Sequence, residues 1–224
     1  MKKGKFIVIE GTDGSGKATQ TRLLAATLRR RGKKVRTIAF PQYGQKSAGA
    51  VEAYLNGVYG TPQQVGTYRA AIFYAVDRAA ARMKILSWLN QENIVIADRY
   101  LASNWAYGGA LLSRAARRKY WRWDKQLEFG LFNIPKPDRT VVLAVPPKIA
   151  QKLILQKHRR QYLKRNKRDA HEQDIRYQGK VLETYRELAR LNREIRVVEC
   201  IVEGRLLSKR EIHERVRRAL RGVV

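Results

Sequence analysis

Residues that form disulfides or bind zinc are almost missing from the sequence. Its one cysteine, Cys200, excludes a disulfide within the chain, and the three histidines do not have the spacing of a zinc site. Long apolar runs are also missing, because none approaches the roughly 20 residues that a membrane-spanning helix requires. The apolar stretch near the N-terminus ends at Glu10, and no cleavage site for a secretory signal follows it. We therefore expect a soluble cytoplasmic protein without a membrane partner.

Acidic residues are scarce as well. The chain has 19 Asp and Glu against 47 Lys and Arg, which gives a formal net charge of +28. Such a surface attracts polyanions, such as nucleotides, nucleic acid or an anionic membrane, but the charge does not indicate a fold. Hydrophobic residues make up 44% of the 224 residues, enough for a sizeable core. This length suits one compact domain, which we expect to span residues 1–224.

Short β-branched runs alternate with longer helical patterns along the chain. Helices are predicted over about Lys17–Arg31, Gln63–Asn90 and Gln173–Leu191. Strands are predicted at Phe6–Glu10, Val35–Phe40, Ile94–Asp98, Thr140–Val145 and Ile195–Val202. This alternation predicts an α/β fold with a five-stranded parallel sheet and helices on both faces. Ligands of such sheets bind outside the carboxyl ends of the strands.

The first predicted strand runs into a glycine-rich loop that opens a helix. Two glycines separated by four residues and followed by lysine form the phosphate-loop pattern. The glycines let N–H groups point inward, the helix N-terminus adds its positive dipole end, and the lysine reaches the β- and γ-phosphates. We therefore predict a P-loop NTPase fold in which Lys17 is catalytic. The predicted ATP-binding residues are Gly11, Thr12, Asp13, Gly14, Ser15, Gly16, Lys17, Ala18 and Thr19.

The residue after the lysine departs from this pattern. A serine or threonine hydroxyl usually meets Mg²⁺ there, whereas this chain has Ala18. Thr19 follows, but one residue of helix turns its side chain away by roughly 100°. We expect Mg²⁺ as the cofactor that accompanies ATP. Nucleotide oxygens, water and the carboxylates of Asp13 and Asp98 would hold it.

Further motifs accompany the phosphate loop and make a more specific combination. They are Glu10-Gly11-Thr12-Asp13, Phe40-Pro41, Tyr54-Leu55-Asn56-Gly57, Tyr74 with Arg78, Asp98-Arg99-Tyr100, Ser103-Asn104, Ala106-Tyr107 and Asp169-Ala170-His171-Glu172. With this set, the chain resembles the thymidylate kinase family of P-loop nucleoside monophosphate kinases over essentially its whole length. The phosphate loop alone is shared with many families.

The resemblance implies that a homodimer transfers the γ-phosphate of ATP to dTMP, giving dTDP and ADP. Asp98 and Arg99 would serve catalysis, and Arg99 would hold the acceptor phosphate. The resemblance also implies a role for each residue of a dTMP site. At the base, Tyr74 stacks on the ring, Arg78 contacts a thymine carbonyl and Asn104 forms a hydrogen bond with the base edge. At the sugar, Tyr107 lies under the ring and disfavours a 2′-hydroxyl, Asp13 meets the 3′-hydroxyl or the metal, and Phe40 forms a wall of the pocket.

Spacing within the chain is compatible with these implied roles. Tyr74 and Arg78 are four residues apart on a predicted helix, so they share a face. After Tyr107 the chain departs from the family, because Gly108-Gly109 replaces the usual glutamine or small polar residue. We expect this change to loosen the selection of base or sugar.

A basic segment at about residues 157–173 corresponds to the family's lid over ATP. Some members carry a catalytic arginine in the phosphate loop, but the matching position here is Gly14. The lid is therefore expected to supply an arginine that stabilises charge on the transferred phosphoryl group. Arg159 and Arg160 are the favoured candidates over Arg165 and Arg168.

Three other functions stay open from the sequence alone. The first is another nucleotide or deoxynucleoside kinase of the same fold. The second is a nucleic-acid-binding P-loop protein, since Arg114–Trp123 interleaves basic and aromatic residues as single-strand binders do. The third is a scaffold with a degenerate site, which Ala18 could signal. Nucleic acid is a possible partner under this interpretation, although not an expected functional one.

Overall fold

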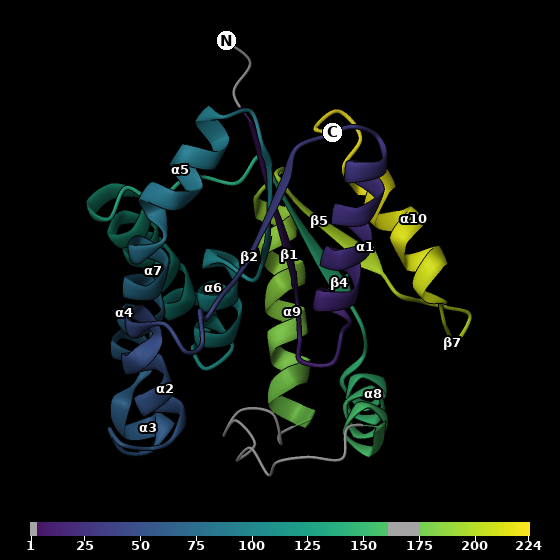
Figure 1. Cartoon of the computed structure of the whole chain (residues 1–224). Helices are drawn as coiled ribbons and strands as arrows, with labels where there is room; N and C mark the ends of the chain where they lie inside the picture. The colour runs from purple at the N-terminus through teal and green to yellow at the C-terminus, as the bar shows by residue number, and fades with distance from the viewer. Residues whose placement is uncertain (1–3, 161–174) are drawn as a thin grey trace.

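The structure, a computed structural model, describes the backbone of residues 4–160 and 175–224 and their side chains except those of 156–160. Five parallel strands form the central sheet in the order β2-β3-β1-β4-β5 (Figure 1). They are β1 (Lys5–Gly11), β2 (Val35–Ala39), β3 (Ile94–Asp98), β4 (Arg139–Ala144) and β5 (Ile195–Glu199). The predicted α/β fold with a five-stranded parallel sheet is confirmed.

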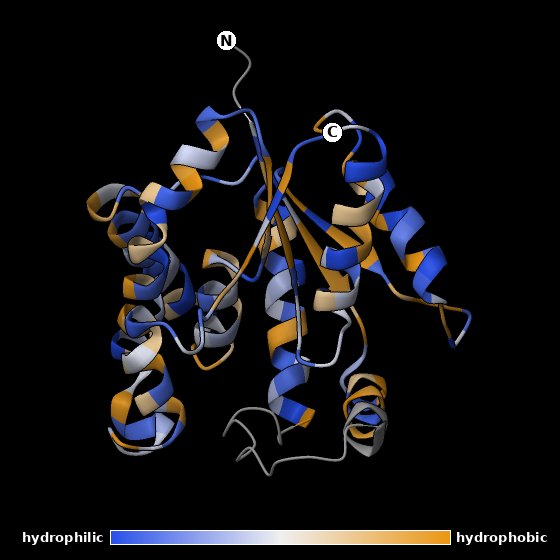
Figure 2. Ribbon diagram, in the orientation of Figure 1, coloured by the Kyte–Doolittle hydropathy of each residue, from blue (hydrophilic) through white to orange (hydrophobic). Residues whose placement is uncertain are grey.

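Helices cover both faces of the sheet, so the central strands are apolar on both sides. On one face, Phe6 and Val8 of β1 pack in a core with helices α5 (Arg82–Asn90), α6 (Leu101–Gly109), α7 (Arg114–Lys125) and α9 (Ile175–Leu191). On the other, Ile7 and Ile9 pack against α1 (Lys17–Arg30) and α10 (Lys209–Ala219). Successive side chains of a strand point to opposite faces, which explains this division. Figure 2 shows the apolar strands between the two helical layers.

The predicted helix Gln63–Asn90 is three helices in the structure. They are α3 (Pro62–Val65), α4 (Thr67–Ala80) and α5, preceded by α2 (Gly49–Leu55). Gly66 separates the first two with φ of 74°, a left-handed conformation that glycine adopts without steric cost. The helix axis breaks again at Ala81, and nothing in the local sequence marks that second break.

The predicted fifth strand, Ile195–Val202, is also interrupted. It leaves the sheet after Glu199, and Ile201–Val202 (β6) pairs antiparallel with Arg205–Leu206 (β7). The reason is a tight turn at Glu203 and Gly204, where both residues have positive φ, as a two-residue hairpin loop requires.

The parallel sheet brings its strand ends together at one edge. In the register of β1 and β3, Ile9 lies opposite Asp98, so the loop after β1 begins beside the end of β3. Helix α8 (Pro147–Arg160) follows β4 at the same edge (Figure 1). The predicted lid at 157–173 begins in the last turn of α8, and its remainder lies outside the described residues. None of the helices in the described part of the chain combines the length and apolar character needed to cross a membrane.

Candidate active site

The loop between β1 and α1 has the properties of an anion site. Gly16 caps α1 with φ of 90° and offers no side chain to the N–H groups of the first turn. Those N–H groups are therefore available to a ligand, and the positive end of the helix dipole points at it. Within the described part of the chain, the buried hydroxyls of Thr12 and Ser15 have no hydrogen-bond partner. Orphaned donors around an open helix N-terminus fit a phosphate group.

Lys17 is the first residue of α1, and its side chain reaches back to the loop. Its Nζ donates to the carbonyl oxygens of Thr12 at 2.9 Å and Gly11 at 3.2 Å. Burial, and then the nearby charge of Arg99, lower the pKa of Lys17 to about 8. A buried amine beside unpaired hydroxyls is a cationic group placed for a polyphosphate.

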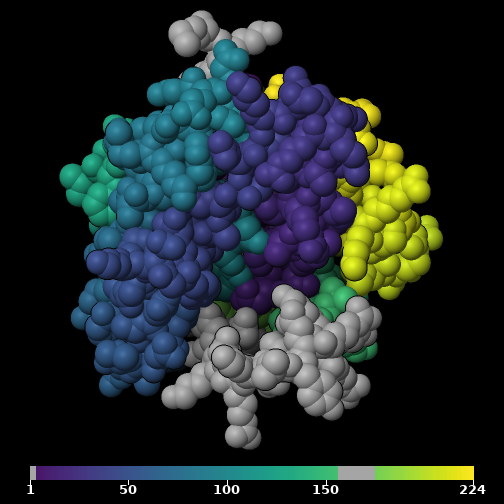
Figure 3. Space-filling view, in the orientation of Figure 1, coloured from purple at the N-terminus to yellow at the C-terminus, as the bar shows by residue number. Residues whose placement is uncertain are grey.

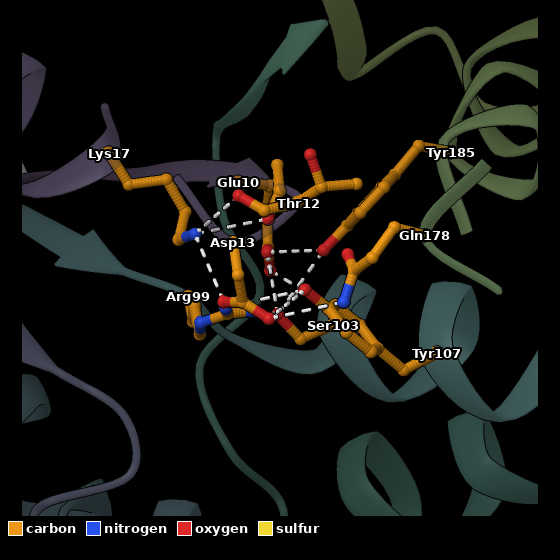
Figure 4. Close-up of polar contacts among 10 residues, drawn as sticks. Glu10, Thr12, Asp13, Lys17, Arg99, Ser103, Tyr107, Gln178 and Tyr185 are labelled. Atoms are coloured by element: carbon orange, nitrogen blue, oxygen red, sulfur yellow. Dashed lines mark hydrogen bonds and ion pairs between the residues drawn. The ribbon is translucent and has the colours of Figure 1, made fainter. Parts of the chain in front are cut away.

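Asp13 of the loop connects three other elements (Figure 4). It forms an ion pair with Arg99, which follows β3, and accepts a hydrogen bond from the Tyr107 hydroxyl of α6 at 3.0 Å. Gln178 of α9 donates to the same oxygen as Tyr107, at 3.5 Å. Burial acts to raise the pKa of Asp13, but Arg99, Lys17 and these hydrogen bonds outweigh it and hold the pKa below its usual value. Asp13 is therefore ionised at neutral pH.

Arg99 has a left-handed backbone with φ of 68°, which is uncommon for a residue with a side chain. Its backbone N–H donates to Ile9 at 3.0 Å, so the turn is fixed against the end of β1. Its guanidinium also lies over the Tyr107 ring, 5.2 Å from the ring centroid, in a cation–π contact. These contacts hold Arg99 beside the phosphate loop.

Asp98, the last residue of β3, has the least engaged carboxylate at this edge. No hydrogen bond or ion pair reaches its side chain from the described residues. Burial raises its pKa, and the charges of Lys17 and Arg99 partly offset that effect. This carboxylate is therefore available to a cation or to water.

Glu10 supports the site by connecting three elements, a role that the sequence did not predict. Its side chain is fully buried and accepts hydrogen bonds from the backbone of Tyr100 at 2.8 Å and the hydroxyls of Ser103 at 2.7 Å and Tyr185 at 2.8 Å. Burial raises its pKa, and these bonds work against that rise. Glu10 thus ties the end of β1 to the start of α6 and to α9. Only the motif Glu10-Gly11-Thr12-Asp13 hinted at it.

Arg78 of α4 lies in a second buried cluster. Its Nε and Nη2 each donate to a carboxylate oxygen of Glu128 at 2.6 Å, which leaves Nη1 without a partner in the described part. Asn104 of α6 donates to the same Glu128 at 3.3 Å and to the carbonyl of Ala71 at 3.1 Å. Glu128 therefore holds the Arg78 guanidinium and the Asn104 amide side by side. The Arg78 Nη1 donor and the Asn104 side-chain oxygen are left for a ligand.

Asp124 lies one helical turn before Glu128 and is fully buried. Among the described residues, neither of its carboxylate oxygens has a well-aligned hydrogen bond, although the side chains of Asn104 and Trp105 lie near enough to act against the rise in its pKa. Burial and then the charge of Glu128 raise the pKa of Asp124 well above its usual value, while Arg78 lowers it. Asp124 therefore retains its proton more strongly than an ordinary carboxyl, and Glu128 is the counterion of Arg78.

A protein-family model for thymidylate kinase matches residues 9–212 of this chain. The thymidylate kinase of Mycobacterium tuberculosis is 38% identical over 185 residues, which cover 82% of this chain and 85% of that protein. This chain belongs to the thymidylate kinase family. The probable thymidylate kinase of Pyrococcus abyssi is 30% identical over 213 residues, 95% of this chain and 93% of that protein. The solved structure of Candida albicans thymidylate kinase has a TM-score of 0.72 at 21% identity, covering 97% and 91% of the two chains, and supports the fold.

Most residues that the thymidylate kinase resemblance singled out lie near one another. Asp13, Lys17, Asp98, Arg99 and Tyr107 share the carboxyl edge of the sheet. Arg78 and Asn104 form the neighbouring cluster through Glu128, whose part the sequence did not indicate because it is 50 residues from Arg78 in the chain. Their roles toward ATP and dTMP remain predictions.

The remaining family positions lie around the same cluster. Phe40 is buried against Tyr100, with ring centroids 5.6 Å apart, and its N–H donates to the carbonyl of Asp98 at 2.9 Å. Tyr74 is half-buried and packs edge-to-face on Tyr54 at 6.4 Å. The side chains of Arg159 and Arg160 lie outside the described residues.

Close packing explains why two positions, 14 and 108, are glycine. A Cβ at Gly14 would clash with the carbonyl oxygen of Ala150, so α8 leaves no room for an arginine at this position of the phosphate loop. A Cβ at Gly108 would lie 2.6 Å from the Tyr120 hydroxyl. Gly108 therefore serves the contact between α6 and α7, and its effect on base or sugar selection stays a prediction.

The aromatic residues of Arg114–Trp123 do not form a stacking surface. Tyr120 and Trp121 are buried and donate hydrogen bonds to the carbonyls of Asn104 at 3.1 Å and Trp105 at 2.9 Å. Trp123 packs against Tyr68, with ring centroids 4.7 Å apart. The exposed side chains of α7 are basic apart from Ala115, and Trp123 is half-buried, so this segment lacks the exposed rings that the single-strand-binding interpretation requires.

Proposed function

We propose that this chain transfers the γ-phosphate of ATP to dTMP, giving dTDP and ADP, in the cytoplasm. The observation that carries the proposal is the pairing of an open phosphate loop with Arg99 and the Arg78–Asn104 pair. The loop suits the polyphosphate of ATP, and Arg99 suits the acceptor phosphate, because its fork can bridge two oxygens. The acceptor phosphate is largely ionised at neutral pH, so the reaction needs positioning and positive charge rather than a general base.

The choice of thymine follows from the hydrogen-bonding pattern of the pair. Arg78 Nη1 offers a donor, and the Asn104 side-chain oxygen offers an acceptor beside it. Thymine presents the complementary edge, a carbonyl oxygen next to an N–H. Cytosine presents the opposite pattern, with an amino group next to an unprotonated nitrogen, and would leave buried groups unpaired.

Mg²⁺ fits the same site with few protein ligands. The described residues contain no group of three acidic, histidine or cysteine side chains that could hold a metal. Asp98 supplies the available carboxylate. Asp13 lies near it, and both carboxylates interact with the charges of Lys17 and Arg99. These two residues would hold Mg²⁺ together with ATP oxygens and water, as is usual for this ion. When bound, the ion neutralises charge that develops on the phosphates.

Turnover across a panel of acceptors tests the proposed function. ADP release would be measured with ATP and each of dTMP, dUMP, dCMP, dGMP, dAMP and thymidine. We expect the highest kcat/KM for dTMP, a loss of about 10- to 200-fold for dUMP, which lacks one methyl group, and a larger loss for dCMP. Turnover of thymidine but not dTMP would indicate a nucleoside kinase, and no turnover with any acceptor would favour a scaffold.

Tyr107 should control selection at the sugar. Its hydroxyl is fixed by Asp13, so the ring has a defined position between the phosphate loop and the acceptor cluster. Tyr107→Ala should narrow the preference for dTMP over its ribonucleotide counterpart by about tenfold, because space opens for a 2′-hydroxyl. Tyr107→Phe keeps the ring and should keep most of the preference. Unchanged discrimination in both variants would reduce Tyr107 to a packing role.

We also propose that the family's homodimer forms through α4. Ile72 and Val76 are exposed and four residues apart, so they form an apolar strip on one face of that helix. Ile72→Glu with Val76→Glu should convert the dimer to a monomer of 25.9 kDa in light scattering. Val58→Glu adds a charge at another exposed apolar position and should leave the dimer intact. A dimer that survives the double change would place the interface elsewhere.

A further inference from the structure

A groove of about 290 Å³ lies between α1 and α10, away from the kinase site. Arg31, at the end of α1, lines it together with Arg217, Arg218 and Arg221 from α10 and the turn after it. Leu24 and Leu28 of α1 and Leu220, which follows α10, form its apolar floor. Figure 1 shows the two helices side by side, with their C-terminal ends at the same edge of the sheet.

The four arginines of this groove lack acidic partners. No carboxylate in the described part of the chain forms an ion pair or hydrogen bond with any of them. The acidic residues of α10 are engaged elsewhere: Glu211 pairs with Arg205 at 2.8 Å, and Glu214, which lines the groove, pairs with Arg210 at 3.5 Å. Four arginines thus line the groove with one carboxylate side chain, that of Glu214, so the groove keeps a net positive charge.

The surroundings extend this charge beyond the groove. Residues 22–36 contain arginines and lysines but no acidic residue, and most of their basic side chains are exposed. Figure 2 shows the hydrophilic character of α10 and of the last turns of α1, and Figure 3 shows both segments at the surface of the molecule. His213, which bonds Thr27 at 3.0 Å across the two helices, has its pKa lowered by burial and then by Arg217 and Arg30. A positive field therefore spans both helices.

We propose that this arginine groove binds the phosphodiester backbone of nucleic acid, as a second function separate from phosphoryl transfer. An arginine guanidinium can donate two parallel hydrogen bonds to the oxygens of one phosphate. Basic residues continue on both sides of the groove, which suits a chain of phosphates rather than a single anion. A protein partner would need an exposed apolar core, and the outer face of α10 is almost entirely charged. An anionic membrane attracts basic residues by charge alone, but it is a flat surface, whereas these arginines line a concave groove that suits a strand. The groove-lining segments of α1 and α10 contain no aromatic residue, so bases have no stacking surface. Binding should therefore be independent of sequence and similar for duplex and single strands.

The position of the groove makes the two functions separable. Helix α1 begins at Lys17 beside the phosphate loop and spans 14 residues, so its far end lies about 20 Å away. Interaction with the helix dipole also stabilises cations at helix C-termini and is another explanation for these arginines. That interaction needs no concave site and acts only within the last turn of a helix. Arg221 lies beyond the last turn of α10 and still lines the groove.

Fluorescence anisotropy with a labelled 20-base-pair duplex, and with DNA and RNA strands of equal length, would measure binding from 50 to 200 mM salt. Arg217→Gln/Arg218→Gln/Arg221→Gln should weaken binding by about tenfold or more and reduce the slope of log Kd against log salt by up to about three. The matched control Arg118→Gln/Lys119→Gln/Arg122→Gln removes three exposed charges from α7 and should change Kd by less than about threefold. Kinase turnover and Tm should stay unchanged in both variants. If the groove variant loses stability, Arg31→Gln with Arg221→Gln replaces it.

Several results would overturn the proposal. Equal losses in the two triple variants would mean that binding follows net charge rather than the groove. A greater loss in the α7 control would place the site there. Absence of binding by the unaltered protein at 150 mM salt, or equal competition by inorganic triphosphate and by nucleic acid of matched phosphate concentration, would exclude a polynucleotide site. Failure of the kinase assay would leave these outcomes unaffected, because none depends on turnover.

Discussion

Replacing Lys17 with methionine should lower kcat for phosphoryl transfer by about 10³-fold without unfolding the protein. The amine lies among unpaired hydroxyls and open N–H groups of the phosphate loop, where preorganised positive charge stabilises the transition state. Methionine keeps most of the length of the side chain and removes its charge together with its hydrogen bonds to the carbonyls of Gly11 and Thr12. Turnover and circular dichroism would be measured together, with the exposed loop residue Lys33→Met as the matched control. Near-normal kcat in a folded Lys17→Met variant would contradict the assignment.

The same variant should be at least as stable as the unaltered protein at pH 7. Burial lowers the pKa of Lys17 to about 8, below its ordinary value of 10.5. At pH 7 the amine is charged in both states, and the folded state bears the cost of its desolvation. Between about pH 8 and 10.5 the folded state binds fewer protons, so this residue's contribution to stability rises with pH. The advantage of Lys17→Met in urea unfolding should therefore shrink across that window, and a constant or growing advantage would contradict the burial of a charged amine.

Replacing Glu128 with glutamine should destabilise the protein by about 3 kcal/mol or more, because it leaves Arg78 charged and buried without its counterion. For a chain of this length that loss lowers Tm by roughly 10 °C. The KM for dTMP should rise as well, since Arg78 and Asn104 both depend on the same carboxylate. Glu187→Gln, which breaks the less buried contact with Arg117, is the matched control and should cost less.

The role of Glu128 as counterion can also be tested through its neighbour Asp124. Burial and the charge of Glu128 raise the pKa of Asp124, so its stability contribution falls as pH rises above the ordinary carboxyl range. Asp124→Asn removes that penalty and should leave stability at pH 7 unchanged or higher. In Glu128→Gln the repelling charge is gone, so Asp124 can ionise and partly replace the lost counterion.

The double variant Glu128→Gln/Asp124→Asn has no such replacement. It should lose more free energy of unfolding than the sum of the two single changes, by about 1 kcal/mol or more. Additive losses would mean that Asp124 does not interact with Arg78 electrostatically. A Glu128→Gln variant with unchanged Tm and unchanged KM would remove Glu128 from the acceptor site altogether.

Features encoded locally could be predicted from the sequence. The β-branched run before Gly11 can be buried on both sides only in a sheet with helices on both faces, so fold class followed from pattern alone. The phosphate loop was equally accessible, since its glycines, its lysine and the following helix are contiguous. Errors arose where a turn overrode a pattern, as at Gly66 and Glu203, where positive φ ends a helix or turns a strand into a hairpin.

The strand and helix order, the phosphate loop and the set of family motifs are encoded in the sequence, because each depends on residues within one or two turns of one another. The pairing of distant groups emerged only in the folded chain: Asp13 with Arg99, Arg78 with Glu128, and Glu10 with Ser103 and Tyr185. The tertiary structure also decided that the aromatics of α7 point inward while the arginines of α1 and α10 converge on one groove. The physical reason is that burial and charge pairing depend on which helix faces meet, and that is set by packing across the whole core rather than by any local run of residues.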